Sequence, residues 1–275
     1  MLVTHFRTLW GNTEPLASYL PDLQRRGYAG IETSLVFHSE SELDQIARLL
    51  PTLGMRLILL ILTGGDNVES HISSLATQLR ASAAFAVKPD KINVHGGCDW
   101  WDWDQTHRYF TAVTGLQREY PDIPLLHETH RSRILFNPWI SRKVLTAFPG
   151  LRLTADLSHW VLVAERHLTG LEFAATMDLV FERTRHIHAR PASPQCIQIS
   201  HLSDPYWKED VDAFAGYWAR ILRKQKELGQ TEVSVDPEFG PAPYSMVLPK
   251  SGAQIVRSLD ECADEVMALV NTIRV

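Results

Sequence analysis

Short apolar runs alternate with longer amphipathic stretches eight times along the chain. The runs are rich in Leu, Ile and Val, which predicts β-strands, and the longer stretches place apolar residues at helical spacing. In the last stretch, for example, Leu259, Cys262 and Val266 share one helical face. The predicted strands span residues 2–10, 30–37, 55–62, 91–97, 123–128, 151–156, 185–188 and 231–238, and the predicted helices span 13–26, 39–54, 68–86, 105–120, 138–148, 170–184, 210–228 and 252–273.

Strict alternation of strand and helix indicates a parallel sheet that is buried on both faces. Eight such units in 275 residues predict an α/β fold, a single (β/α)8 TIM barrel that forms one domain over residues 1–275. A doubly wound open sheet is the structural alternative. It receives no support from the sequence, because no glycine-rich phosphate-binding fingerprint follows a predicted strand.

Four polar residues close the last four predicted strands: Glu128, Asp156, His188 and Glu238. The carboxyl ends of barrel strands meet at one end of the barrel, so these side chains are expected to converge. One acidic residue after a strand is ordinarily a helix cap or turn residue, but three acidic residues and a histidine on four successive strands favour a metal site. Three carboxylates and one imidazole suit one divalent metal ion, Mn²⁺, Mg²⁺, Co²⁺ or Zn²⁺, and the lack of a cysteine argues against a structural zinc site.

The composition is that of an ordinary globular enzyme, with 45% hydrophobic and 21% charged residues. A net charge of −5 offers no basic surface to nucleic acid or to an anionic membrane. The longest apolar stretch, around residues 57–62, is too short to span a bilayer, and the first residues do not read as a secretory signal. Three widely spaced cysteines (Cys98, Cys196 and Cys262) predict reduced thiols and a cytoplasmic protein.

Four segments carry a family resemblance: HETHRSR (127–133), TADLSHW (154–160), RHIHARP (185–191) and DPEFGP (236–241). In this order they resemble the xylose-isomerase-like TIM barrel superfamily, and more narrowly its sugar phosphate isomerase/epimerase-type proteins. Ketose 3-epimerases, inosose dehydratase and AP endonuclease family 2 are related members. The resemblance covers essentially the whole chain, and it implies that the four strand-end residues bind one divalent metal ion.

The resemblance also implies catalytic roles. In the ketose 3-epimerases the glutamates that match Glu128 and Glu238 both bind the metal and carry protons. A histidine at the place of His159, three residues after Asp156, contacts substrate hydroxyl groups. His159 is therefore a catalytic and substrate-binding candidate, and its alternative role is that of a loop or helix-capping histidine.

Further polar residues near the strand ends are candidates for substrate binding. Arg190 and His130 each follow a predicted ligand by two residues and share its inward face. The planar guanidinium of Arg190 is suited to a substrate oxygen, with a surface salt bridge as the alternative. His130 is suited either to contact substrate or to support Glu128. His95 lies at the end of the fourth predicted strand and is expected to line the same open end of the barrel, with a core histidine as the alternative.

Aromatic residues near the same end are also candidates. The segment CDWWDWD (98–104) contains Trp101, and Trp10 closes the first predicted strand. Tryptophan rings stack on the C–H faces of sugars, so both residues are predicted to contact substrate. A lid or a dimer contact is the alternative for the tryptophan-rich segment. Glu32 is a further candidate for the mouth, whereas His186 and Asp236 are expected to make structural hydrogen bonds inside the barrel.

These features predict a metal-dependent isomerase or epimerase that acts on a sugar or related polyhydroxy carbonyl compound through an enediolate. Ile134 stands where the ketose 3-epimerases carry a second glutamate. A metal-dependent dehydratase or lyase of the inosose- or dehydroshikimate-dehydratase kind therefore stays open, as does a non-catalytic sugar-binding barrel. The additional ligands of three-zinc endonucleases, and the lysine of hydride-shift isomerases, are not found. The expected partner is a small sugar-like molecule rather than nucleic acid or membrane. Substrate phosphorylation and oligomeric state, including a homo-oligomer, stay open.

Overall fold

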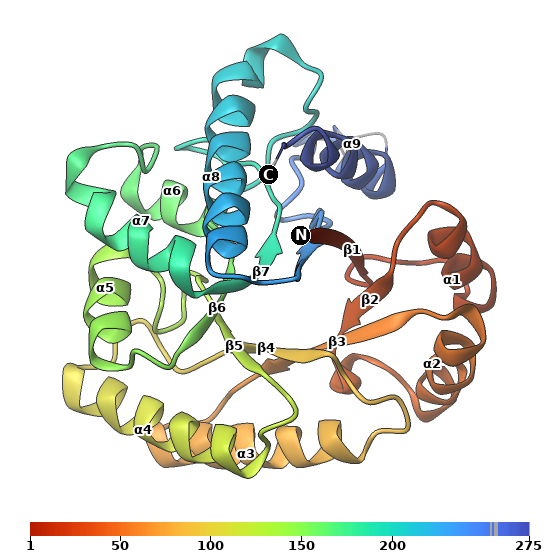
Figure 1. Ribbon diagram of the computed structural model, residues 1–275. Helices are drawn as coiled ribbons and strands as arrows, with labels where there is room; N and C mark the ends of the chain where they lie inside the picture. The colour runs from red at the N-terminus through yellow and green to blue at the C-terminus, as the bar shows by residue number, and fades with distance from the viewer. Residues whose placement is uncertain (254, 256–257, 275) are drawn as a thin grey trace.

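Eight parallel strands form a closed barrel in sequence order in the computed structural model, which describes residues 1–253, 255 and 258–274 (Figure 1). The predicted α/β (β/α)8 TIM barrel is therefore confirmed. The strands are β1 (Leu2–Thr8), β2 (Gly30–Thr33), β3 (Arg56–Leu62), β4 (Lys91–His95), β5 (Leu125–Glu128), β6 (Arg152–Ala155), β7 (Thr184–His188) and β8 (Glu232–Asp236).

Helices surround the barrel, as Figure 1 shows. None of those in the described residues is long and apolar enough to cross a membrane. They are α1 (Leu16–Arg25), α2 (Glu40–Leu53), α3 (Val68–Ala84), α4 (Trp103–Glu119), α5 (Pro138–Ala147), α6 (Ser158–Ala164), α7 (Leu171–Arg183), α8 (Lys208–Glu227) and α9 (Leu259–Asn271), with the short 3-10 helices η1 (Leu35–Phe37) and η2 (Pro205–Trp207).

Several predicted boundaries differ from the structure by a few residues, and three local differences are larger. The second strand ends at Thr33 rather than at residue 37, because only Gly30–Thr33 pair with β3 and the chain then turns into η1. The short helix α6 follows β6 directly and was not predicted. The last helix begins at Leu259 rather than near residue 252, since the Ser258 side chain caps it. Residues 254, 256 and 257 of that prediction lie outside the described residues.

Capping residues fix where several helices begin. At α2, the Ser39 side chain accepts a hydrogen bond from the Glu42 backbone N–H, and the Glu42 carboxylate accepts one from the Ser39 backbone N–H, which together form a capping box. Asp102 and Gln105 form the same arrangement at α4. This second box fixes the tryptophan-rich segment against the start of α4.

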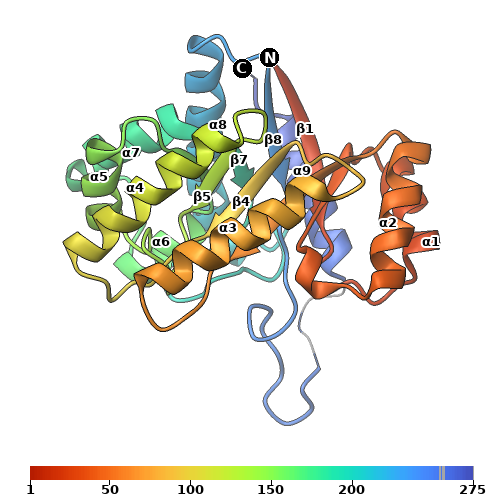
Figure 2. The ribbon, with the colours of Figure 1, turned by 90° about the horizontal axis from the view of Figure 1, so that it is seen from below.

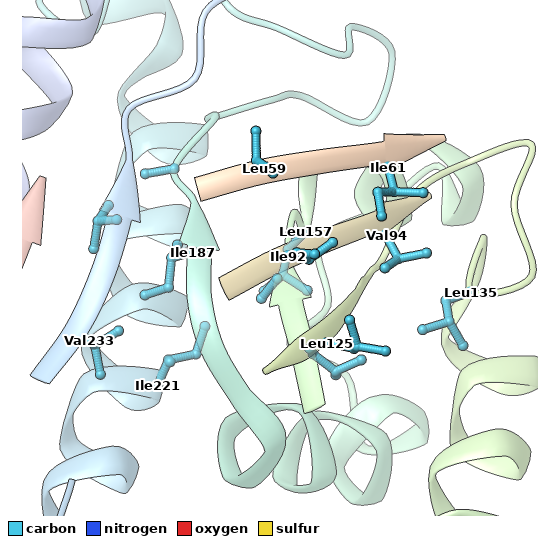
Figure 3. Close-up of a cluster of buried hydrophobic side chains, with 14 of the residues drawn as sticks. Leu59, Ile61, Ile92, Val94, Leu125, Leu135, Leu157, Ile187, Ile221 and Val233 are labelled. Carbon is cyan, nitrogen blue, oxygen red and sulfur yellow. The ribbon is translucent and has the colours of Figure 1, made fainter. Parts of the chain in front are cut away.

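The main hydrophobic core lies between the barrel and its helices. Outward-facing strand residues supply it, and Figure 3 shows several of them, Leu59, Ile61, Ile92, Val94 and Leu125. Inward-facing residues alternate with these and include many polar side chains. The interior of the barrel therefore holds buried polar side chains that could form a ligand-binding or catalytic site. The segment after β8 extends beyond one end of the barrel (Figure 2) and contributes Tyr244 to the cavity described below.

Candidate metal centre

The four predicted ligand residues meet inside the barrel. One donor atom from each of Glu128, Asp156, His188 and Glu238 lies within 4.8 Å of the others. Glu128 and His188 close β5 and β7, and Asp156 and Glu238 follow β6 and β8 by one and two residues. All four side chains are buried. Inward alternation on four successive strands thus brings three carboxylates and one imidazole to a single point.

Arg190 is in direct contact with this cluster. Its Nη2 atom lies 2.9 Å from Asp156 Oδ2 and 2.5 Å from Glu238 Oε2. Arg190 is only 1% exposed, so the alternative of a surface salt bridge is wrong. Burial opposes the charge of the guanidinium, but the carboxylates of Glu238 and Asp156 hold its pKa above the usual value. Arg190 therefore supplies a permanent positive charge beside the candidate ligands.

The carboxylates have different proton affinities. Burial raises the pKa of Asp156 to about 6, although the Arg190 charge opposes this shift. Burial would also raise the pKa of Glu128, but His95 and His188 outweigh it and hold that pKa well below the usual value. The environment therefore favours an ionised Glu128 more strongly than an ionised Asp156.

His188 presents its two ring nitrogens to different partners. Nδ1 lies 2.8 Å from Glu238 Oε2 and 3.4 Å from Glu128 Oε2, yet it is buried and makes no hydrogen bond within the described residues. Nε2 lies 3.1 Å from both carboxylate oxygens of Glu32. Burial would lower the pKa of His188, but the surrounding carboxylates, Glu238 foremost, raise it well above the usual value. A buried ring nitrogen that lies among carboxylates and makes no hydrogen bond to the described residues fits the donor set of a divalent cation.

Three histidines form a row beside the cluster. His95 Nε2 lies 2.6 Å from Glu128 Oε2, and the ring centroids of His95 and His130 are 4.4 Å apart. His130 and His159 follow at 3.9 Å. Burial lowers the pKa of His130 to about 3 and that of His159 well below the usual value. Both rings are therefore neutral near pH 7.

His159 lies behind the cavity wall rather than on it. It is completely buried, and neither ring nitrogen has a hydrogen-bond partner among the described residues. Its Nε2 atom is 3.5 Å from Asp156 Oδ2. The lining residues include His95 and His130 but not His159. The predicted substrate contact of His159 stays a prediction, and in this structure its neighbours are Asp156, His130 and Tyr244.

A cavity of about 230 Å³ opens above the cluster. Trp10 forms part of its wall and packs edge-on against Tyr244 with ring centroids 4.8 Å apart. Gly240 allows this packing, because a Cβ atom there would lie 2.1 Å from the Trp10 ring. The lining residues are Thr8, Trp10, Glu32, Thr33, Phe37, Leu60, Leu62, His95, Glu128, His130, Arg133, His188, Arg190, Glu238 and Tyr244.

Trp101 does not belong to this lining. It is 8% exposed and packs against Tyr109 and His71 in the hydrophobic core. Trp10 thus lies at the cavity and Trp101 lies away from it. The prediction that Trp101 contacts substrate is not met in this structure, whereas Trp10 lines the cavity as expected. Trp101 directly precedes Asp102, which caps α4, and its ring packs against Tyr109 of that helix.

Several residues at the site were not predicted. Asn93 Nδ2 donates to Glu128 Oε2 at 2.6 Å, and Arg133 and Tyr244 line the cavity. The period-two pattern contains a signal for Asn93, which lies two residues before His95 on the same inward face. Arg133 and Tyr244 lie on loops, for which strand periodicity gives no position.

No protein-family model matches the chain, and no curated protein sequence matches it. Solved structures do match. D-allulose 3-epimerase from Methylomonas sp., in complex with D-allulose, has a TM-score of 0.68 and 15% identity, covering 99% of this chain and 97% of that one. The probable 3-DHS dehydratase AsbF from Bacillus anthracis has a TM-score of 0.63 and 11% identity, with 98% and 100% coverage. Endonuclease IV from Thermus thermophilus has a TM-score of 0.61 and 12% identity, with 98% of each chain covered.

At these identities the likeness concerns the fold alone. It extends over nearly the full length of each of these three structures. The fold that the motif resemblance implies is therefore confirmed: the chain has the same fold as these solved structures of a 3-epimerase, a probable 3-DHS dehydratase and endonuclease IV.

Proposed function

We propose that this protein is a divalent-metal-dependent isomerase or epimerase that removes a proton α to the carbonyl group of a sugar or related polyhydroxy compound. The observation that carries the proposal is the convergence of Glu128, Asp156, His188 and Glu238 at a cavity inside the barrel. Neighbours in fold include ketose 3-epimerases and a probable dehydratase, which supports this class of chemistry.

The cavity offers the contacts that a small polyhydroxy substrate needs. Trp10 and Tyr244 provide apolar ring surface, and His95, His130 and Arg190 provide hydrogen-bonding groups beside the candidate ligands. Such sites typically combine an apolar wall with a few well-placed polar groups. We assign these five residues to substrate binding and leave Trp101 out, because it packs in the core.

A divalent cation held by the four residues would act as a Lewis acid on the substrate carbonyl and so acidify the neighbouring C–H bond. The chain's own groups would then move the proton. Glu128 is held in place by Asn93 and His95, which contact the same Oε2 atom at 2.6 Å. Glu238 is ionised because Arg190 and His188 outweigh burial and lower its pKa. Two positioned carboxylates fit the roles of base and acid.

A dehydratase is the second candidate, and a specific observation favours it. Ile134, at the place of the second glutamate of the epimerases, is buried in the hydrophobic core. Elimination of a hydroxyl group needs an acid near the leaving oxygen. The Tyr244 hydroxyl group lies at the cavity, 3.4 Å from His130 Nε2, and offers such an acid.

One screen tests these alternatives. Protein loaded with Mn²⁺, Mg²⁺, Co²⁺ or Zn²⁺ is incubated in D₂O with ketoses, inososes and keto-glycosides, and the products are followed by NMR. Deuterium at the carbon α to the carbonyl, with isomer formation, is the expected result. Loss of water with a new conjugated product would indicate the dehydratase. Transfer of the original hydrogen to the neighbouring carbon would overturn the enolate mechanism, and binding without turnover would indicate a non-catalytic sugar-binding barrel.

We infer a cytoplasmic location and one domain over residues 1–275, with manganese among the candidate metals. Cys98, Cys196 and Cys262 are free thiols, which suits a reducing compartment. A homo-oligomer is also compatible with this proposal.

A further inference from the structure

Glu32 lies at the base of the cavity, next to the ligand cluster. It is 2% exposed, and its carboxylate contacts polar groups from β4 and β7. Its oxygens lie 2.8 Å from His186 Nε2, 3.1 Å from His188 Nε2 and 3.1 Å from Asn93 Nδ2. β2 and β7 are not neighbours in the barrel, so these contacts cross its interior.

We propose that Glu32 is a positioning residue that holds His188 with Nδ1 directed toward the metal and thereby sets metal affinity. This inference rests on the proposed metal site. A carboxylate accepts hydrogen bonds and donates none when ionised, so Glu32 requires the proton of His188 to be on Nε2. A ligating nitrogen must offer its lone pair. Glu32 therefore favours the one neutral form of His188 whose Nδ1 can bind a metal among Glu128 and Glu238.

Other buried side chains keep Glu32 in this orientation. His186 contacts Glu32 through Nε2, and its Nδ1 atom lies 2.8 Å from Ser234 Oγ. Lys91 Nζ in turn donates to Ser234 Oγ at 2.7 Å. Rotation of the Glu32 carboxylate would leave buried donors of His186, His188 and Asn93 without an acceptor, which is costly in a barrel interior. The surrounding buried side chains therefore stabilise the contact between Glu32 and His188.

The variant Glu32→Gln tests the role, because it keeps the size of the side chain and removes its charge. Zn²⁺ dissociation constants are measured by competition with a chromophoric chelator, and thermal unfolding of the metal-free proteins reports folding. Loss of a group that orients a metal-bound histidine typically weakens metal binding by about 10- to 100-fold. Ser234→Ala is the matched control, since Ser234 is buried in the same chain of contacts but does not touch His188. We expect this control to lose much less affinity than Glu32→Gln, because Glu32 keeps its contacts with His188 and Asn93.

Equal zinc affinity in Glu32→Gln and wild type would overturn the inference, and so would equal weakening in Glu32→Gln and Ser234→Ala. Nitrogen NMR of histidine-labelled wild-type protein provides a test that needs no variant. The zinc-loaded protein should show His188 bound through Nδ1 with Nε2 protonated, and zinc on Nε2 would contradict the assignment.

The metal-free wild-type protein separates this inference from the proposed function. It should show a slowly exchanging Nε2 proton on His188, because that proton is buried against Glu32. If wild type binds no metal while this proton is observed, the proposed function fails and the orientation of His188 by Glu32 stands. If the Nε2 proton exchanges freely, the positioning role is wrong whether or not metal binds.

Discussion

Arg190 lies between Asp156 and Glu238, with one guanidinium nitrogen in contact with a carboxylate oxygen of each. Two of the four candidate metal ligands thus share a buried cationic partner that belongs to the chain itself. This partner offsets part of the repulsion among the clustered carboxylates. Arg190 and a divalent cation would then stabilise the same pair of negative charges.

This relationship predicts how metal and stability are linked. Arg190→Met should lower the free energy of unfolding of the metal-free protein by about 3–5 kcal/mol, because two buried carboxylates lose their cation. Saturating Mn²⁺ should restore part of this loss, since a ligand that binds only the folded state stabilises it. Urea unfolding with and without Mn²⁺ measures both effects.

Arg7→Met is the control for this experiment. Arg7 is also buried and pairs with Asp260, away from the ligand cluster. Its loss should destabilise the protein, and Mn²⁺ should not reduce that loss relative to wild type. The interpretation fails if Mn²⁺ has the same effect on the stability of both variants.

A second prediction concerns the ligands themselves. His188→Ala and Glu238→Gln should each lose bound metal while retaining the fold, because each removes one of four donors that meet within 4.8 Å. Elemental analysis after dialysis measures the metal, and circular dichroism checks the fold. His71→Gln, a change at a buried histidine on α3, should keep full metal content. Full occupancy in both ligand variants would rule out this site.

The candidate metal cluster could be predicted from sequence because of strand geometry. Period-two alternation determines which residues of β5 to β8 face inward, and closure of a barrel brings their carboxyl ends together. No information about side-chain conformation is needed to predict the four candidate ligands, Glu128, Asp156, His188 and Glu238. The same reasoning placed His95 and His130 at the cavity.

Other contacts at the site depend on how the barrel closes and how its loops run, which strand periodicity does not predict. The contact between Glu32 and His188 joins strands that are not neighbours, so it depends on the shape of the closed barrel. Tyr244 reaches the cavity from the segment after β8, whose course is set by loop conformation. Trp101 packs against Tyr109 and His71 in the hydrophobic core, although its neighbours in the sequence are exposed or half-buried. Sequence patterns place such residues near the site, but they do not predict the direction in which the side chains point.

Buried neutral histidines predict a pH dependence of stability. Burial lowers the pKa of His127 in the folded state from 6.5 to about 3. Below pH 6.5 the unfolded chain therefore binds a proton at this residue that the folded chain does not, and stability falls as the pH falls toward 3. The loss approaches about 1.4 kcal/mol per pH unit for one histidine.

His127→Leu isolates this contribution. Urea unfolding at pH 7 and pH 5 should show a smaller loss of stability for the variant than for wild type, whatever the absolute stability of each. His127 packs against Tyr109 and Phe110, outside the barrel interior, so the metal site is not changed directly. An unchanged difference between the two pH values would show that His127 is not the residue responsible.

The last prediction concerns His159, whose ring lies behind His130 and beside Asp156. If His159 positions groups that contact substrate, His159→Gln should bind metal as wild type does and lose about 10²-fold in kcat, the typical cost of one misplaced catalytic contact. His127→Leu is the matched control, because it replaces another fully buried neutral imidazole that lies outside the site. Steady-state kinetics on a substrate found in the screen should show the loss in His159→Gln and wild-type kcat in His127→Leu. Equal rates in all three proteins would assign His159 to the scaffold.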